Sequence, residues 1–516
     1  MSEPIVSWLL HTNSLQLERQ TRRKKCDEIR PICGACARLD FQCTYGAPTS
    51  PTKASRTPAK SSLNSRNDAA PETVVDAPVS APTLNRSLNH MPKGLRTERD
   101  WNVFNYCSTQ YMRLLTSPEA TSKFRDVSFV FALGFDEPWV MHSALAPAAL
   151  HASFASLLPK EDAMLYTQSA LQGLQQALQP RSGRIPPEDA FLAASLFLGV
   201  FEGPKILEDR VAKIPRLDIG QLSILHSTLL DSVLYHFSTR LIFEKDIDAT
   251  CRSFPCQTMI KYIEALEVAK RDNRAEPLIL PVLGRTPPAL FVQIYQITWL
   301  SRQIPFRDRD LYGLASQSLI ELEALAEKYP AVVSDDMPCL KPSVTVSFTN
   351  SEIAAKLYYI AAQIFVAKVL NPEGLSSQSP QIQAQISKGA ALLEMYDATS
   401  PCGQFICWPL LILGCAACPT TTSEAQQTRS SNIYAFHRSE LRCLIQAKLV
   451  QIWHVSYSGY VKRTAGALEK VWQLPSVLVN VSGRTCAASE EVTFDGLSAL
   501  IHKEGLGAGF LVAENG

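Results

Sequence analysis

The stretch Glu352–Leu370, EIAAKLYYIAAQIFVAKVL, decides the fold class. Its apolar side chains recur at steps of three and four residues, the spacing that places them on one face of an α-helix. They are Ile353, Leu357, Ile360, Ile364 and Ala367. The segment Leu311–Lys328 repeats this spacing with Leu314, Leu319, Leu322 and Leu325. Two such segments predict long helices that bury one face against a common core.

Other segments between residues 98 and 516 also favour helices. Pro186-Pro187-Glu188-Asp189 is typical of a helix start, because proline fits the first turn and acidic side chains lie near the positive end of the helix dipole. The apolar run Phe191–Phe201 follows it. The other predicted helices are Trp101–Leu115, Trp139–Leu157, Ala163–Leu178, Leu222–Phe243, Thr258–Asp272, Ala289–Gln303, Ile382–Tyr396, Ile433–Trp453 and Gly459–Trp472. Weak strand candidates occur near Ser476–Val481 and Gly509–Val512. We therefore predict a mainly α protein in which residues 98–516 form one large all-helical domain.

The composition agrees with a helical body. Glycine accounts for 23 of 516 residues, below the ~7% of average proteins. Charged residues make up 19% and apolar residues 46%, which argues against a wholly disordered chain. The longest apolar run, Phe405–Cys418, has 14 residues, whereas a membrane span needs about 20. We therefore expect a buried helix there and no membrane partner.

The N-terminal part differs in charge and composition. Residues 1–97 carry 14 Lys/Arg against 8 Asp/Glu, a net charge of +6, and the remainder carries 36 against 41, a net charge of −5. A basic segment on a mildly acidic body indicates an arm that meets polyanions. Residues 47–97 contain no Phe, Trp or Tyr and are rich in Pro, Ser, Thr and Ala. Such a stretch buries too little apolar surface to offset its ordering entropy, so it is predicted to be a disordered linker.

Residues 19–46 are basic and dense in cysteine. Four cysteines, Cys26, Cys33, Cys36 and Cys43, are spaced C-x6-C-x2-C-x6-C. A C-x2-C turn lets two thiolates converge on one ion, and zinc prefers thiolates in a tetrahedron. The alternative is four buried thiols, but the surrounding sequence is not apolar enough to bury them. The spacing therefore predicts a zinc site.

The segment 21–45, TRRKKCDEIRPICGACARLDFQCTY, resembles the second two-thirds of a fungal binuclear zinc-cluster DNA-binding domain. That family has six cysteines, C-x2-C-x6-C, a loop and C-x2-C-x6-C, which hold two zinc ions. Its last four cysteines match those named above, and its basic run matches Arg22, Arg23 and Lys25. The resemblance implies zinc as the cofactor and double-stranded DNA as a partner.

The first cysteine pair of the family is missing. Its positions are taken by Gln16 and Arg19, so the chain as written is expected to hold at most one of the family's two zinc ions. Two explanations are open. Residues 1–18, which show no helical or strand period, could stem from an error in the gene model, which we favour. Alternatively, the domain is truly degenerate and holds one zinc on four thiolates, or none.

The resemblance also implies roles in DNA binding. In the family the basic run lies on a short metal-held helix that enters the major groove. By position, Arg22 and Arg23 are the candidates to read bases, and the family typically reads CGG-type triplets. Contacts with phosphates are expected from Lys24, Lys25, Arg30 and Arg38. A nuclear localisation signal at Thr21–Lys25 is a second reading that does not exclude the first.

The body resembles the fungal-specific transcription factor domain. The matching pieces are VLGRTPPALFVQIYQITWL at 282–300, FICWPLLILGCAA at 405–417 and ALEKVWQ at 467–473. The resemblance implies a nuclear regulator of RNA polymerase II promoters that contacts the transcription machinery, with no enzyme activity. Control of a metabolic or secondary-metabolite gene cluster is common in the family, and a homodimer is compatible with it. The alternative is a transcriptional cofactor that has lost DNA binding.

A helical enzyme is the third hypothesis, and its signals are weak. Cys415 and Cys418 form a C-x2-C pair, but they lie in an apolar run without basic neighbours, which favours core packing. The glycines in Gly505-x-Gly507-x-Gly509 favour a tail rather than a phosphate loop. His142 and His151 lie on a predicted apolar helix and are expected to be partnered core residues.

Overall fold

The structure is a computed structural model. It describes residues 94–125, 128–177, 188–202, 224–272, 279–329, 348–418, 433–473, 478–479, 492–493, 496–502 and 506. The predicted atypical N-terminus 1–18, zinc module 19–46 and the linker up to residue 93 lie outside these residues. So does the strand candidate Gly509–Val512.

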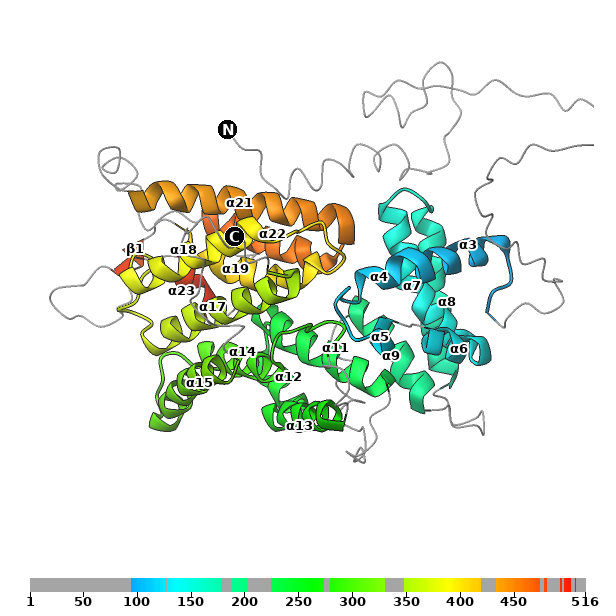
Figure 1. Ribbon diagram of the computed structural model, residues 1–516, viewed down its shortest axis with the longest axis horizontal. Coiled ribbons are helices and arrows are strands. Elements are labelled where there is room, and N and C mark those ends of the chain that lie inside the picture. Colours follow the sequence, from blue (N-terminus) through cyan, green and yellow to red (C-terminus); the bar gives the residue numbers. More distant parts are fainter. Residues whose placement is uncertain are drawn as a thin grey trace, which may run out of the picture. The chain divides into compact units, whose positions relative to one another are not determined.

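The described chain is helical, which confirms the predicted fold class (Figure 1). Its first helices are α3 (Glu98–Tyr106), the π-helix η2 (Cys107–Tyr111), α4 (Met112–Leu114), α5 (Ser122–Arg125), α6 (Ser128–Asp136), α7 (Pro138–Phe154), α8 (Lys160–Ala177) and α9 (Glu188–Glu202). Thr97 and Asp100 form a capping box at the start of α3, so the side chain of each accepts a backbone hydrogen bond from the other.

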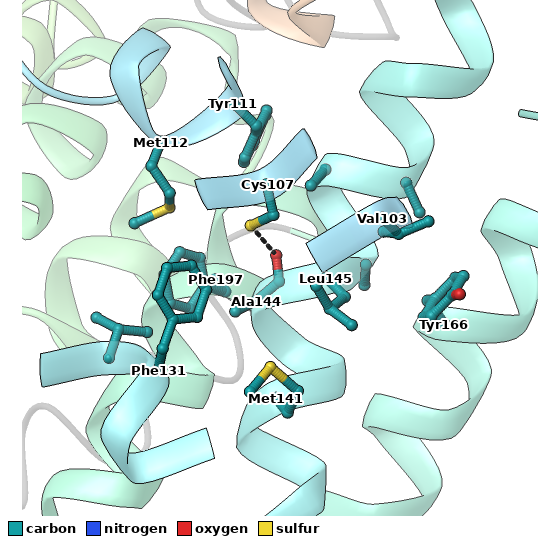
Figure 2. Close-up of a cluster of buried hydrophobic side chains, with 14 of the residues drawn as sticks. Val103, Cys107, Tyr111, Met112, Phe131, Met141, Ala144, Leu145, Tyr166 and Phe197 are labelled. Carbon is teal, nitrogen blue, oxygen red and sulfur yellow. Dashed lines mark hydrogen bonds between the residues drawn. The ribbon is translucent and has the colours of Figure 1, made fainter. Parts of the chain in front are cut away.

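Helix α7 is the centre of this first group and packs against α3, α6, α8 and α9. Its sequence, PWVMHSALAPAALHASF, is apolar on all sides, and its alanines allow neighbouring helices to approach closely. Figure 2 shows part of the resulting core, in which the Cys107 thiol donates a hydrogen bond to the carbonyl of Ala144 at 3.4 Å.

The second group completes the domain. Its helices are α11 (Ile224–Arg240), η4 (Leu241–Phe243), α12 (Ile247–Ser253), α13 (Cys256–Asp272), α14 (Pro288–Ser301), α15 (Arg309–Lys328), α17 (Asn350–Leu370), α18 (Pro380–Met395), η5 (Gly403–Ile406), α19 (Cys407–Ala416), α21 (Ile433–Ser456), α22 (Gly459–Gln473) and α23 (Gly496–Leu500). The short strands β1 (Leu478–Val479) and β2 (Val492–Thr493) pair antiparallel, with Leu478 opposite Thr493.

Helix α19 lies at the centre of the second group. All its residues are buried, and it packs against α17, α18, α21, α22 and α23. Trp408 on α19 stacks on Tyr358 of α17, with ring centroids 5.8 Å apart and an interplanar angle of 6°. The predicted buried helix at Phe405–Cys418 is therefore confirmed.

Helix α17 contains the stretch Glu352–Leu370, whose apolar spacing predicts a helix. A capping box between Thr349 and Glu352 starts it, and it packs against α14, α15, α18 and α19. Among the described helices, α17 alone is long and apolar enough to cross a membrane. Because 78% of that apolar window is buried inside the protein, α17 has the surroundings of a core helix.

The predicted helices in the described ranges are present, with ends that differ by a few residues. Leu314, which we placed on the apolar face of 311–328, is 37% exposed, whereas Leu322 is fully buried. Four helices were not predicted from the sequence, namely α5, α6, α12 and α23. Three of them have seven residues or fewer, and α6 (SFVFALGFD) has no polar face to give a period. The strand candidate Ser476–Val481 contains β1, and its partner β2 was not predicted.

Truncation of one core leucine tests the central place of α19. Leu413 is fully buried and Leu314 is 37% exposed, so we expect Leu413→Ala to lower the free energy of unfolding by about 2–5 kcal/mol. The matched variant Leu314→Ala should change it by no more than about 0.5 kcal/mol. Urea denaturation followed by circular dichroism measures both, and equal losses would contradict the central position of α19.

Candidate functional site

The residues that the sequence assigned to zinc and DNA all lie outside the described residues. They are Cys26, Cys33, Cys36, Cys43, Arg22, Arg23, Lys24, Lys25, Arg30 and Arg38. Two features of the described helical domain are candidates for function: the turn at 280–286, which contains the start of one family-like motif, and a cavity beside α11.

The turn at 280–286 is held by a buried carboxylate. Asp231 on α11 is fully buried, and its two oxygens accept hydrogen bonds from the backbone amides of Val282 (2.6 Å) and Leu283 (3.1 Å). Gly284 has a φ of +58°, and a Cβ at this position would lie 2.4 Å from the Ser351 hydroxyl. The turn therefore depends on the Asp231 side chain, which accepts the two amide hydrogen bonds, and on a glycine at position 284.

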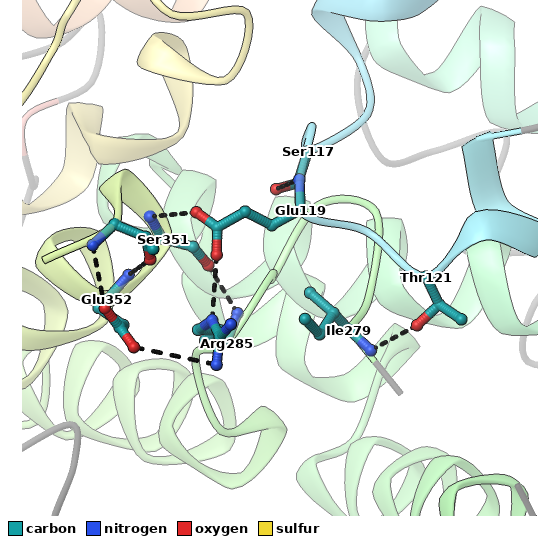
Figure 3. Close-up of polar contacts among 8 residues, drawn as sticks. Ser117, Glu119, Thr121, Ile279, Arg285, Ser351 and Glu352 are labelled. Carbon is teal, nitrogen blue, oxygen red and sulfur yellow. Dashed lines mark hydrogen bonds and ion pairs between the residues drawn. The ribbon is translucent and has the colours of Figure 1, made fainter. Parts of the chain in front are cut away.

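Figure 3 shows how this turn connects three distant segments. The Nε of Arg285 donates to Glu119 Oε2 at 3.0 Å, and the backbone amide of Ser351 donates to Glu119 Oε1 at 3.2 Å. The guanidinium also lies 3.9 Å from Glu352 at the start of α17. The charges of Glu119 and Arg285 are thus used to join the loop after α4 to α14 and α17, which is a structural role.

The other two motif pieces also serve packing. ALEKVWQ ends α22, where the indole N–H of Trp472 donates to the carbonyl of Gly414 at 2.8 Å. A Cβ at Gly414 would lie 2.5 Å from Leu468 Cδ2, so the absence of a side chain lets α22 approach α19 closely. The motifs therefore mark contacts between helices rather than a catalytic centre.

A cavity of about 340 Å³ lies beside α11. Its walls come from the first group of helices, including α4, α7 and α9, and from α11, η5, α21 and α22. Most of the lining side chains are aromatic or aliphatic. The exceptions include four basic groups, which are His236 and Arg240 on α11 and Lys462 and Arg463 on α22. None of the described lining residues is Asp or Glu.

The lining residue His151 has a hydrogen-bond partner at each ring nitrogen. His151 on α7 hydrogen-bonds through Nδ1 to the Tyr106 hydroxyl (2.6 Å) and through Nε2 to the carbonyl of Val455 (3.0 Å). Because a carbonyl only accepts, Nε2 carries the proton and Nδ1 accepts from Tyr106. Burial lowers the pKa of His151, so the ring is neutral at pH 7. This confirms the expectation of a partnered histidine.

The basic side chains of the cavity differ in their surroundings: Lys462 is partly buried and Arg463 is exposed. The Lys462 ammonium lies 4.5 Å from the centre of the Trp453 ring and 5.5 Å from that of Phe154. Burial and then the charge of Lys160 lower the pKa of Lys462. Burial and then the charge of Arg463 lower the pKa of Arg240 to about 10.

His236 lies beside these arginines. Burial, followed by the charges of Arg240 and Arg463, lowers its pKa well below the ordinary value of 6.5. Its Nδ1 is shielded from solvent and has no hydrogen-bond partner among the described residues. A buried polar atom without a partner normally costs free energy, so it points to a missing partner.

The weak enzyme signals do not form a site. Cys415 and Cys418 are buried in the core, and the Cys418 thiol donates to the carbonyl of Val471 at 3.3 Å. The described ranges hold no group of three or more His, Cys, Asp or Glu arranged for a metal. The glycines of Gly505-x-Gly507-x-Gly509 lie outside those ranges.

Comparison with protein families identifies the chain. The model of the fungal specific transcription factor domain matches residues 102–476. The chain belongs to the fungal specific transcription factor family. Residues 20–52 match the fungal Zn(2)-Cys(6) binuclear cluster domain. Searches of curated proteins and of solved structures found no match.

Membership in this fungal transcription factor family confirms several expectations. The protein is a fungal transcription regulator with a zinc-binding, DNA-binding domain, which is a nuclear role, and its families indicate a regulator rather than an enzyme. The donor set of residues 20–52 consists of four cysteines rather than the family's six. Four thiolates fit one tetrahedral zinc but do not complete a two-zinc cluster.

Sequence reasoning missed the basic side of the cavity. His236 and Arg240 are four residues apart on α11, so they lie on one face of that helix. Two basic side chains on one face of an apolar helix were the available signal. The partner side chains on α22 follow more than 200 residues later, and no periodicity connects them.

The buried Asp231 predicts a pH effect on stability. Burial raises its pKa from 3.8 to about 7 even though two backbone amides oppose the shift. The folded state therefore holds the proton more tightly than the unfolded state does, and stability falls as pH rises from about 4 to about 7.

Urea denaturation across this range should show the free energy of unfolding of the wild type decreasing relative to that of Asp231→Asn. Well above pH 7, where Asp231 is ionised in both states, the difference should become constant. A difference that stays flat between pH 4 and pH 7 would show that Asp231 is already ionised throughout.

Proposed function

We propose that this regulator binds CGG-type elements in RNA polymerase II promoters through residues 19–46, while the helical domain controls its activity. The observation that carries the proposal is the match of 20–52 to a zinc-cluster domain in a segment that is basic and holds four cysteines. We further propose that residues 47–97 link this module to the helical domain at 98–516, and that the genes controlled form a metabolic or secondary-metabolite cluster.

In the proposed module, Cys26, Cys33, Cys36 and Cys43 hold one zinc ion. The ion supplies a rigid centre for a segment too short to fold around a core of its own. The cysteine residues contribute thiolates, and the metal neutralises part of their charge. The chain between them then presents its basic side chains on one side.

We propose two different roles in DNA binding for the basic side chains of the module. Arg22 and Arg23 are proposed to reach the edges of guanine bases, because the guanidinium pairs bidentately with O6 and N7. Phosphate contacts are proposed for Lys24, Lys25, Arg30 and Arg38. Such contacts add affinity on any sequence and weaken with salt.

A second candidate is a transcriptional cofactor that does not bind DNA. The missing first cysteine pair favours it, because Gln16 and Arg19 cannot replace two thiolates. In that case the helical domain acts through protein contacts alone.

Zinc content and a gel shift separate the two candidates. We expect the full chain to carry about one zinc per molecule and to shift a CGG probe more than a scrambled one. A chelator should abolish the shift and added zinc should restore it. Cys36→Ser should lose both zinc and DNA binding, whereas the control Cys443→Ser, at an exposed cysteine of α21, should keep both. A zinc-free chain that ignores both probes at low salt would favour the cofactor.

Two substitutions test the roles within the basic run. Arg22→Ala should reduce the preference for CGG over a single-base variant by about 1–3 kcal/mol. Lys25→Ala should weaken binding to all probes alike and lower the slope of log K against log salt by about 1. Binding isotherms at several salt concentrations measure both. Equal losses on every probe for the two variants would contradict the assignment.

A further inference from the structure

The cavity beside α11 combines an apolar wall with a basic one. Tyr111, Met112 and Phe197 from the first group of helices, which Figure 2 labels, are among its lining residues. His236, Arg240 and Arg463 line it as well. Its volume of about 340 Å³ lies within the ~300–1,000 Å³ typical of small-molecule sites.

The basic side chains that line the cavity act on one another through their charges. After the larger effect of burial, the charge of Arg463 lowers the pKa of Arg240, and the charges of both arginines lower the pKa of His236. The charge of Glu244 shifts the pKa of Arg240 in the opposite direction, with a smaller effect than the charge of Arg463. Since no described acidic side chain lines the cavity, an anion placed there would relieve the repulsion.

The orphaned Nδ1 of His236 gives a second, independent indication. It is shielded from solvent and unpartnered among the described residues, although the ring lines the cavity. With an anionic oxygen beside it, the imidazole can hold its proton on this nitrogen and donate it. The same oxygen would lie near two guanidinium groups, which suit carboxylate and sulfonate oxygens.

The apolar wall decides which anion fits. Tyr457 and His151 lie in ring contact (5.1 Å between centroids), and Trp453 and Phe154 do so as well (5.9 Å). These four rings line the cavity. A flat aromatic body would be buried among them, whereas a heavily hydrated inorganic phosphate would lose its water against carbon.

We propose that this cavity binds a small aromatic organic acid in its anionic form, with the acid group against His236, Arg240 and Arg463 and the ring system against the aromatic wall. The proposal rests on the regulator function, for which it supplies an effector class. Such a ligand would contact the first group of helices and α22 at once, and would therefore stabilise their mutual packing.

Two dyes with the same ring system test the proposal on the full chain. The anion 1-anilinonaphthalene-8-sulfonate should bind with one-to-one stoichiometry and at least about tenfold more tightly than neutral N-phenyl-1-naphthylamine. Fluorescence titration measures both. Arg463→Gln and Arg240→Gln should weaken the anionic dye about tenfold and leave the neutral dye within roughly twofold. Arg463→Lys, which keeps the positive charge, should bind the anionic dye more tightly than Arg463→Gln does.

The exposed Arg307, which does not line the cavity, gives the control variant Arg307→Gln. It should leave both affinities unchanged. Circular dichroism checks folding, and if Arg240→Gln unfolds, the exposed Arg463 decides the outcome. Equal affinity for the two dyes, or no loss in Arg463→Gln, overturns the proposal. A chain that shifts the CGG probe but fails this test refutes the cavity site alone, and one that binds the anionic dye but no DNA refutes the DNA-binding function alone.

Discussion

The complete burial of α19 is the constraint on which the helical domain depends. Every residue of this helix is shielded from solvent, and five neighbouring helices supply the shield. A helix without a polar face cannot remain at a surface, so the surrounding elements must close around it. Gly414 and the Trp472 indole show how closely they do so. These two motif residues therefore serve the close packing of α22 against α19.

Long helices could be predicted from sequence because each has one strong local signal. In α17 the apolar spacing and the capping residues Thr349 and Glu352 act within a few residues of one another. Helix α6, which has no polar face, and the short α23 gave no such signal, because tertiary contacts rather than local periodicity hold them in place. Gly496 in α23 illustrates this, since a Cβ there would lie 2.2 Å from the carbonyl of Cys415.

The zinc module and the cavity differ in how well their residues can be predicted from the sequence. The proposed zinc ligands lie in one short segment with a fixed spacing, so they could be identified from the sequence alone. Their role is still a proposal. The cavity depends on α7, α11 and α22, whose contributions are far apart in the chain. His236 and Arg463 become neighbours only after the helices pack. Sequence patterns report such long-range encounters poorly, because nothing local distinguishes an arginine on a cavity wall from one in water.

The aromatic contacts between Phe154 on α7 and the end of α21 affect how shortened forms of the protein can be made. Phe154, Trp453 and Tyr457 cover one another although about 300 residues separate the first from the others. A shortened polypeptide that ends before residue 433 would leave the Phe154 ring bare, together with other parts of the first group. Exposed aromatic surface of this kind would promote aggregation of such fragments. The N-terminal helices should therefore be expressed together with the C-terminal segment, if necessary as two separate chains.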